Sequence, residues 1–133
     1  MIQHKVDLTG IILKPNMILA GNKSNNKISN EEVSSKTIEC LKKSVPREVP
    51  GIAFLSGGQS EIEATENLNL INKNNDTNFI MTYSYGRALQ QSALKFWSND
   101  IKNIKGTQDI FNHRAKMCSL AAKGKWSKEL ENK

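Results

Sequence analysis

The stretch that decides the fold is Leu8-Thr9-Gly10-Ile11-Ile12-Leu13-Lys14-Pro15-Asn16-Met17. Its apolar run, Ile11-Ile12-Leu13, has the length and the β-branched content of a buried strand. Because a residue that precedes proline is driven toward extended geometry, Lys14 is expected to end that strand and to point out of the end of a sheet. Partial burial of the amine there would favour its neutral, nucleophilic form. Alternatively, the lysine stem packs on the strand while its charge lies in water.

The composition limits the class of protein. A chain of 133 residues, 38% of them apolar, is long enough for one domain with its own core. It has no apolar run of about 20 residues, the length that spans a membrane, and no signal-peptide stretch near its first residue. We therefore expect a cytoplasmic protein without a membrane partner. Cys40 and Cys118 lie far apart without metal-binding spacing, so we expect reduced thiols and no metal.

The formal charge of +6 and the pI near 9.4 raise the question of nucleic-acid binding. The basic residues are scattered among acidic ones, and neither an arginine-rich run nor a nucleic-acid module is found. We therefore expect no nucleic-acid partner. Excess positive charge equally suits a phosphorylated small substrate or an ordinary solvated surface.

Beyond the first strand, the chain alternates between strand and helix patterns. Ser29 and Ser60 each stand three residues before a glutamate, which is the spacing of a helix capping box. The remaining predicted elements are a strand at 52–55 covered on both faces, a strand at 79–83, helices near 29–45, 60–71 and 88–97, and a last helix from 101 or 107 to 122. Alternating βα units predict a parallel sheet with helices outside it. We assign residues 1–126 to one domain and residues 127–133 to a polar tail.

Each predicted strand ends in residues that can take part in chemistry. These ends are Lys14, Ser56-Gly57-Gly58 and Ser84-Tyr85-Gly86-Arg87. Parallel α/β folds place their active sites at the carboxyl ends of the strands. A diglycine alone is more simply explained as a tight turn that needs a positive φ. Two such turns on consecutive strands, one of them with an arginine, favour phosphate binding, because backbone N–H groups and a guanidinium both suit that anion.

An amine and a phosphate site at the same sheet edge predict imine chemistry on a phosphorylated carbonyl compound. A neutral lysine attacks the ketone and forms a Schiff base, which then accepts electrons during cleavage or formation of a C–C bond. Contacts to the phosphate would hold the carbonyl carbon beside the amine.

Four motifs carry a resemblance to a known family: Leu13-Lys14-Pro15-Asn16-Met17, Phe54-Leu55-Ser56-Gly57-Gly58-Gln59-Ser60, Asn67-Leu68-Asn69, and Ser84-Tyr85-Gly86-Arg87-Ala88-Leu89-Gln90 with Ser92-Ala93-Leu94-Lys95. In order and spacing they resemble class I fructose-bisphosphate aldolase, from about His4 to Trp126. The resemblance implies a (β/α)8 TIM barrel of glycolysis, usually a homotetramer, that needs no cofactor. It cleaves fructose 1,6-bisphosphate to dihydroxyacetone phosphate and glyceraldehyde 3-phosphate.

Residue by residue, the resemblance makes Lys14 the Schiff-base lysine. It places the substrate phosphate on four residues, with two more in the same neighbourhood: Ser56, Gly57, Gly86 and Arg87, with Leu55 and Ser84. Thr9 stands where the family commonly has a glutamate.

The resemblance covers only the sixth to the eighth strands of the barrel, since a full barrel takes about 250 residues. The family's acid–base carboxylates come from earlier strands, so proton transfers around an imine are expected to be slow in this chain alone. Three strands cut from a barrel also leave two unpaired edges. We therefore expect association with a complementing N-terminal half, with a second copy, or in aggregates. The alternative function is a non-catalytic aldolase fragment that binds sugar phosphates or docks on a complementing chain.

Overall fold

Three parallel strands form the framework of the computed structural model, which describes residues 4–21, 23–26 and 28–132. They are β1 (Ile12–Leu13), β2 (Gly51–Phe54) and β3 (Ile80–Tyr83), in the order β1-β2-β3. Ile12 pairs with Gly51, and Gly51 pairs in turn with Ile80. The predicted α/β architecture with a parallel sheet is confirmed, although β1 has only two residues.

Four helices accompany the sheet: α1 (Asn30–Ser44), α2 (Glu61–Asn74), α3 (Arg87–Asn99) and α4 (Ile104–Ala121), together with the short 3-10 helices η2 (Leu8–Gly10) and η3 (Lys128–Asn132). The predicted capping box is complete at α2, where Ser60 Oγ accepts from the N–H of Glu63 and the Glu63 carboxylate accepts from the N–H of Ser60. At α1 only its first half forms, from the N–H of Glu32 to Ser29 Oγ at 3.2 Å.

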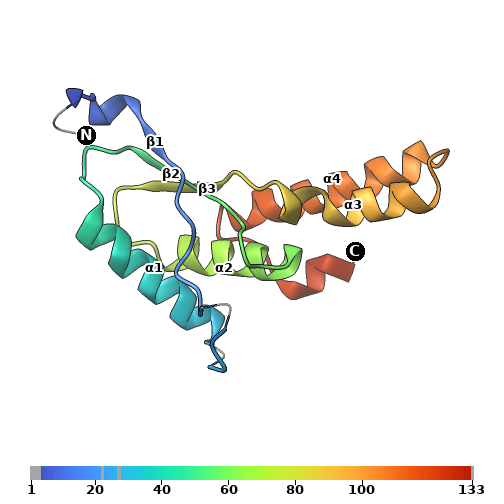
Figure 1. Ribbon diagram of the computed structural model, residues 1–133, viewed down its shortest axis with the longest axis horizontal. Coiled ribbons are helices and arrows are strands. Elements are labelled where there is room, and N and C mark those ends of the chain that lie inside the picture. Colours follow the sequence, from blue (N-terminus) through green and yellow to red (C-terminus); the bar gives the residue numbers. More distant parts are fainter. Residues whose placement is uncertain (1–3, 22, 27, 133) are drawn as a thin grey trace.

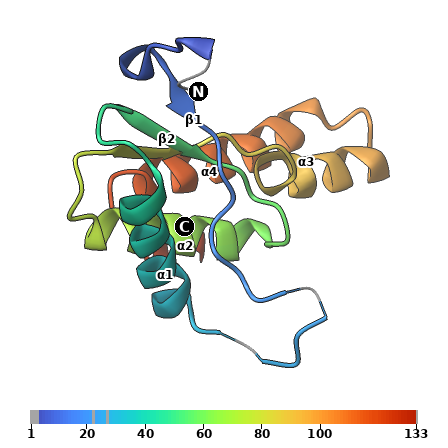
Figure 2. The same ribbon diagram turned by 60° about the vertical axis from the view of Figure 1, so that its left-hand side comes forward.

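The helices cover only one face of the sheet. In Figures 1 and 2, α1 and α2 lie on the same side of the strands, and no α-helix of the described residues covers the opposite side. On the open face, Ile12 and Ile80 are 69% and 75% exposed, on either side of Gly51. The expectation that the second strand is covered on both faces, and that the first is buried, is therefore wrong for this chain. The apolar residues are present, but no described element packs against this face.

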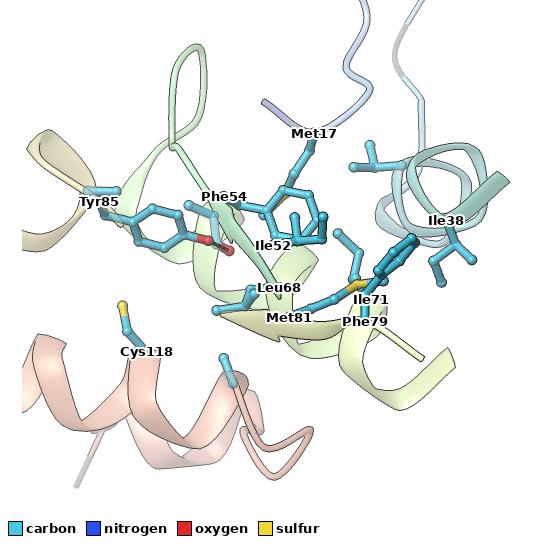
Figure 3. Packing of buried hydrophobic residues seen from close by; sticks show 14 of the residues in the cluster. Met17, Ile38, Ile52, Phe54, Leu68, Ile71, Phe79, Met81, Tyr85 and Cys118 are labelled. Atoms are coloured by element: carbon cyan, nitrogen blue, oxygen red, sulfur yellow. Dashed lines mark hydrogen bonds between the residues drawn. The ribbon is translucent and has the colours of Figure 1, made fainter. Parts of the chain in front are cut away.

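The core lies between the sheet and the helices. Ile52, Phe54 and Met81 point from the strands toward Leu68 and Ile71 of α2, as Figure 3 shows, and each of the five is at most 2% exposed. Because β2 alternates between buried and half-buried residues, only every second side chain contributes to this core. Val33, Ile38 and Leu41 bury one face of α1 in the same cluster.

The end of the domain at Trp126 and the described part of the predicted tail, 127–132, pack on the helices. Trp126 is buried, and its backbone N–H donates to Asn69 Oδ1 at 3.0 Å. In η3 the Glu131 carboxylate accepts from both terminal nitrogens of Arg114 on α4. It also accepts from the indole N–H of Trp126 at 2.8 Å. The segment is therefore docked on α2 and α4 by one buried and several partly buried hydrogen bonds, which charge and hydropathy alone do not indicate.

The cysteines are free thiols, as predicted: Cys40 is exposed and Cys118 is buried. Burial raises the pKa of the Cys118 thiol. No helix in the described part of the chain is both long and apolar enough to cross a membrane.

Candidate active site

The carboxyl ends of the three strands are joined by backbone hydrogen bonds. The N–H of Leu55, just past β2, donates to the carbonyl of Pro15 at 3.0 Å. The N–H of Ser84, just past β3, donates to the carbonyl of Phe54 at 2.8 Å. Strand pairing thus continues one step beyond each strand, so the segments after Leu13, Phe54 and Tyr83 lie side by side at one edge of the sheet.

Lys14 follows β1 directly at this edge, and its side chain is exposed. Because side chains alternate along an extended segment, Lys14 lies on the same face as Ile12, the face that no helix covers. The partial desolvation predicted for its amine is absent from this chain. The physical reason is the open face: desolvation requires residues packed against this side of the strand, and no described residue packs there.

The segment Ser56-Gly57-Gly58-Gln59 is a tight turn closed by the N–H of Gln59 on the carbonyl of Ser56 at 3.2 Å. Gly58 has a φ of +78°, which a turn with glycine in its third position requires. The structural explanation of the diglycine therefore holds for Gly58. Ser56 and Gly57 are half-buried, and their N–H groups donate no hydrogen bond among the described residues. Both N–H groups remain available to an anion.

The two helix N-termini at this edge differ in their capacity for an anion. At α2 the Glu63 carboxylate occupies the N-cap in the capping box, and Glu61, also in the first turn, accepts from the N–H of Ser92 on α3 at 2.9 Å. Hydrogen bonds from Ser60 lower the pKa of Glu63, so this carboxylate stays charged there. The partial positive charge of the helix N-terminus behind the diglycine is therefore opposed by these carboxylates at α2. At α3 the N-cap is Gly86, no side chain caps the helix, and its first turn has no acidic residue.

Arg87 is the first residue of α3, and both it and Ser84 are exposed. Arg87 makes no ion pair with another described residue. A guanidinium beside uncapped N–H groups is the strongest anion-binding feature of the site. The phosphate-binding donors predicted from the sequence are thus best provided on the β3 side, by Gly86 and Arg87.

Tyr85 anchors the turn after β3 from below. Its hydroxyl donates to the carbonyl of Ala64 in α2 at 2.8 Å, and its side chain is buried against Phe54 (Figure 3). Burial raises the pKa of this phenol, so it stays protonated and keeps donating. The buried tyrosine fixes Ser84 and Gly86 on either side of it.

A cavity of about 380 Å³ lies between the segment that follows the lysine strand and the diglycine turn, lined by 16–20 and by Gly57 and Gly58. Asn16 is a lining residue of this cavity that the sequence did not single out. Its side chain bridges the two sides of the site, with Nδ2 donating to the carbonyl of Gly57 at 3.3 Å. An amide residue directly after a Lys-Pro strand end is the signal that could have indicated this bridge.

No group of three or more His, Cys, Asp or Glu side chains in the described part of the chain is placed to hold a metal ion. The groups that the structure gathers at this edge are the amine of Lys14, the backbone N–H groups of the two turns and the guanidinium of Arg87. These groups suit nucleophilic attack by an amine on a substrate that carries a phosphate.

Comparisons with known proteins identify the family. The family model for glycolytic fructose-bisphosphate aldolase class-I matches residues 1–133. The probable fructose-bisphosphate aldolase class 1 of Xylella fastidiosa is 43% identical over 127 residues, which cover 95% of this chain and 38% of that protein. Fructose-bisphosphate aldolase A of Salmo salar is 47% identical over 124 residues, covering 92% and 34%.

A comparison with solved structures gives the same family. The Plasmodium falciparum fructose-bisphosphate aldolase, in a ternary complex with TRAP and a small-molecule inhibitor, superposes with a TM-score of 0.87 at 42% identity. The match covers 92% of this chain and 35% of that one. The chain thus spans a little over a third of the length of the proteins that it matches.

Proposed function

Because this chain belongs to the class I fructose-bisphosphate aldolase family, we propose that it supplies the imine-forming lysine and the phosphate-binding turns of an aldolase active site. The substrate class is a phosphorylated sugar or triose, and the reaction is cleavage of fructose 1,6-bisphosphate to dihydroxyacetone phosphate and glyceraldehyde 3-phosphate. The observation that carries the proposal is the alignment of Lys14, the Ser56-Gly57 turn and the Gly86-Arg87 turn at one edge of the sheet.

The chemistry begins at Lys14. Its neutral amine adds to the ketone carbon, and loss of water with a proton gained leaves a protonated imine. The C–C bond then breaks between the carbon adjacent to the imine carbon and the next, hydroxyl-bearing carbon. Its electron pair moves into an enamine as the aldehyde leaves. The substrate hydroxyl gives up its proton to a base. Protonation of the enamine carbon and hydrolysis of the imine release dihydroxyacetone phosphate and restore the amine.

The phosphate contacts hold the carbonyl carbon near the amine. Ser56, Gly57, Gly86 and Arg87 contribute N–H groups and a guanidinium, while Leu55 and Ser84 position the two turns through their backbone bonds. An anion held at this edge converts binding into proximity, because the carbonyl then meets Lys14 at high effective concentration.

The rest of the fold belongs to the same proposal. Residues 1–126 correspond to the sixth to eighth βα units of a (β/α)8 barrel, and the open face with Ile12 and Ile80 faces its interior. The remaining strands and the acid–base carboxylates would come from a complementing N-terminal half, in an assembly that is a homotetramer in this family. The two free cysteines are in keeping with a cytoplasmic location.

Reductive trapping tests the proposal directly. The chain is incubated with dihydroxyacetone phosphate, the imine is reduced with borohydride, and the adduct is located by peptide mass spectrometry. We expect covalent mass on Lys14 and none in Lys14→Arg. Lys95→Arg, which changes an exposed lysine on α3, is the matched control and should leave the adduct intact. An adduct spread over many lysines, or none on the folded chain, would contradict the proposal.

A second candidate function is a non-catalytic fragment that binds sugar phosphates or docks on a complementing aldolase chain. The exposure of Lys14 and the open sheet face favour it, because no described residue of this chain covers either of them. It predicts thermal stabilisation by dihydroxyacetone phosphate that is lost in Arg87→Ala, with no adduct on Lys14. Stabilisation together with a Lys14 adduct would instead favour the catalytic proposal.

A further inference from the structure

We propose that Asn16 is a positioning residue, whose carboxamide sets the distance between the diglycine turn and the lysine strand. It thereby determines how far a phosphate on Ser56 and Gly57 lies from the amine of Lys14. The inference rests on the proposed function and names the residue that couples its two halves.

Both ends of the Asn16 carboxamide are engaged. Nδ2 donates to the carbonyl of Gly57 at 3.3 Å, and Oδ1 accepts from the N–H of Met17 at 2.9 Å. Because the Gly57 carbonyl can only accept and the Met17 N–H can only donate, the reversed orientation of the amide would lose both bonds. The side chain is therefore oriented by its partners.

The position of Asn16 explains why this bond matters. Lys14 and Asn16 are separated only by Pro15, whose ring fixes φ and whose carbonyl accepts from Leu55. Beyond Leu55 the turn leaves the sheet. Among the described residues, the bond from Asn16 is the one that ties Ser56, Gly57 or Gly58 back to the lysine segment.

Gly57 itself is built for a close approach. A Cβ at this position would lie 3.0 Å from Leu55 Cδ1 and 3.8 Å from Asn16 Nδ2. A Cβ there would require the end of the Leu55 side chain to shift slightly, and it would be in ordinary van der Waals contact with the Asn16 amide. The pair of Asn16 and a side-chain-free residue 57 thus allows the turn to sit against the lysine segment, at one wall of the 380 Å³ cavity.

The consequence for the reaction is specific. A phosphate raises the rate of imine formation only if its binding site lies at a fixed distance from the amine. Loss of the Asn16 bond frees the turn, so the phosphate advantage falls while the reactivity of Lys14 toward a substrate without phosphate stays the same.

The test compares borohydride trapping on the complete 133-residue chain with two probes, dihydroxyacetone phosphate and dihydroxyacetone. In the unsubstituted chain we expect the phosphorylated probe to be trapped faster. In Asn16→Ala we expect the ratio of the two rates to fall about tenfold, which corresponds to one hydrogen bond to a positioning group, with the dihydroxyacetone rate unchanged. Asn99→Ala, at the far end of α3 (Figure 1), is the matched control and should preserve the ratio.

The outcomes separate this inference from the proposed function. If Asn16→Ala leaves the ratio of the two trapping rates unchanged, the positioning role is refuted. If both rates fall equally, Asn16 contributes only to the stability of the fold, and the positioning role is refuted as well. If the unsubstituted chain reacts with neither probe, the proposed function fails. Amide exchange at Gln59, whose N–H closes the turn, then decides about Asn16 alone. Faster exchange in Asn16→Ala supports the conclusion that the Asn16 bond holds the turn, and unchanged exchange refutes it.

Discussion

Replacing Glu131 with glutamine is expected to undock the C-terminal segment. The Glu131 carboxylate is the common acceptor for Arg114 on α4 and for the indole of Trp126, and His113 Nε2 lies 3.5 Å from it. The side chains of Glu131 and Arg114 are each only 9% exposed. Glutamine has nearly the same shape, so the substitution removes the charge while leaving the packing almost unchanged.

The magnitude follows from what Arg114 loses. Removing one partner of a buried ion pair typically costs about 3–5 kcal/mol, because the other charge is left uncompensated. Two contacts reduce this figure here. Arg114 keeps a hydrogen bond of 3.1 Å to Thr65, and the glutamine oxygen can still accept from Trp126. We therefore expect the free energy of unfolding to fall by about 2–3 kcal/mol in Glu131→Gln.

Urea unfolding followed by tryptophan fluorescence measures this change, because Trp126 is buried in the docked segment. Asp109→Asn is the matched control: it removes a carboxylate from the exposed pair with Lys105 and should cost less than about 0.5 kcal/mol. A double-mutant cycle with Arg114→Met isolates the coupling between the two charges. If Glu131→Gln unfolds at the same urea concentration as Asp109→Asn, the docking of this segment does not depend on the ion pair and the reasoning is refuted.

Three further results are expected. Arg87→Ala should weaken binding of inorganic phosphate about tenfold by calorimetry, because the guanidinium is the charged donor of the candidate site; unchanged affinity would remove Arg87 from it. Ser60→Ala should lower the free energy of unfolding by about 1 kcal/mol in urea, since it breaks the capping box of α2, whereas Ser98→Ala near the end of α3 should have less effect. Hydrogen bonds from Ser60 lower the pKa of Glu63 below its ordinary 4.5. Burial opposes such a shift at Glu131, but hydrogen bonds from Arg114 and Trp126 outweigh it and lower that pKa too. The stability that these two carboxylates contribute is therefore complete at neutral pH and is lost as the pH falls below 4.5. Urea midpoints measured at descending pH should therefore drop in acid, and less so in Glu131→Gln.

Much of the fold could be predicted because its signals are local. The residues of the capping boxes, the Lys-Pro strand end and the alternation of strand and helix each lie within a few neighbouring positions, and the structure confirms the elements that they predict. The docking of the C-terminal segment could not be predicted. It depends on Glu131 meeting Arg114, 17 residues away, and Trp126 meeting Asn69, 57 residues away. Neither spacing has a sequence signature.

The candidate site divides in the same way. That three strand ends meet at one edge follows from parallel pairing, which the βα alternation already implies. That the N-terminus of α2 is closed to anions while that of α3 is open depends on which first turn contains carboxylates. Glu61 and Glu63 could have been recognised in the sequence as competitors for the phosphate. The bridge from Asn16 to Gly57 joins residues 41 positions apart and needed the structure.

The environment of Lys14 is a property of the face on which it lies rather than of its own stretch of sequence. Ile12, two residues earlier on that face, is 69% exposed, although its strand has the composition of a buried one. A strand with exposed apolar side chains is stable only when other residues cover that face. The open face that leaves Ile12 exposed also leaves the Lys14 amine hydrated. Whatever covers Ile12 and Ile80 therefore also determines how much water surrounds the Lys14 amine. Under the proposed function, burial of the two isoleucines should therefore accompany any gain in the reactivity of Lys14.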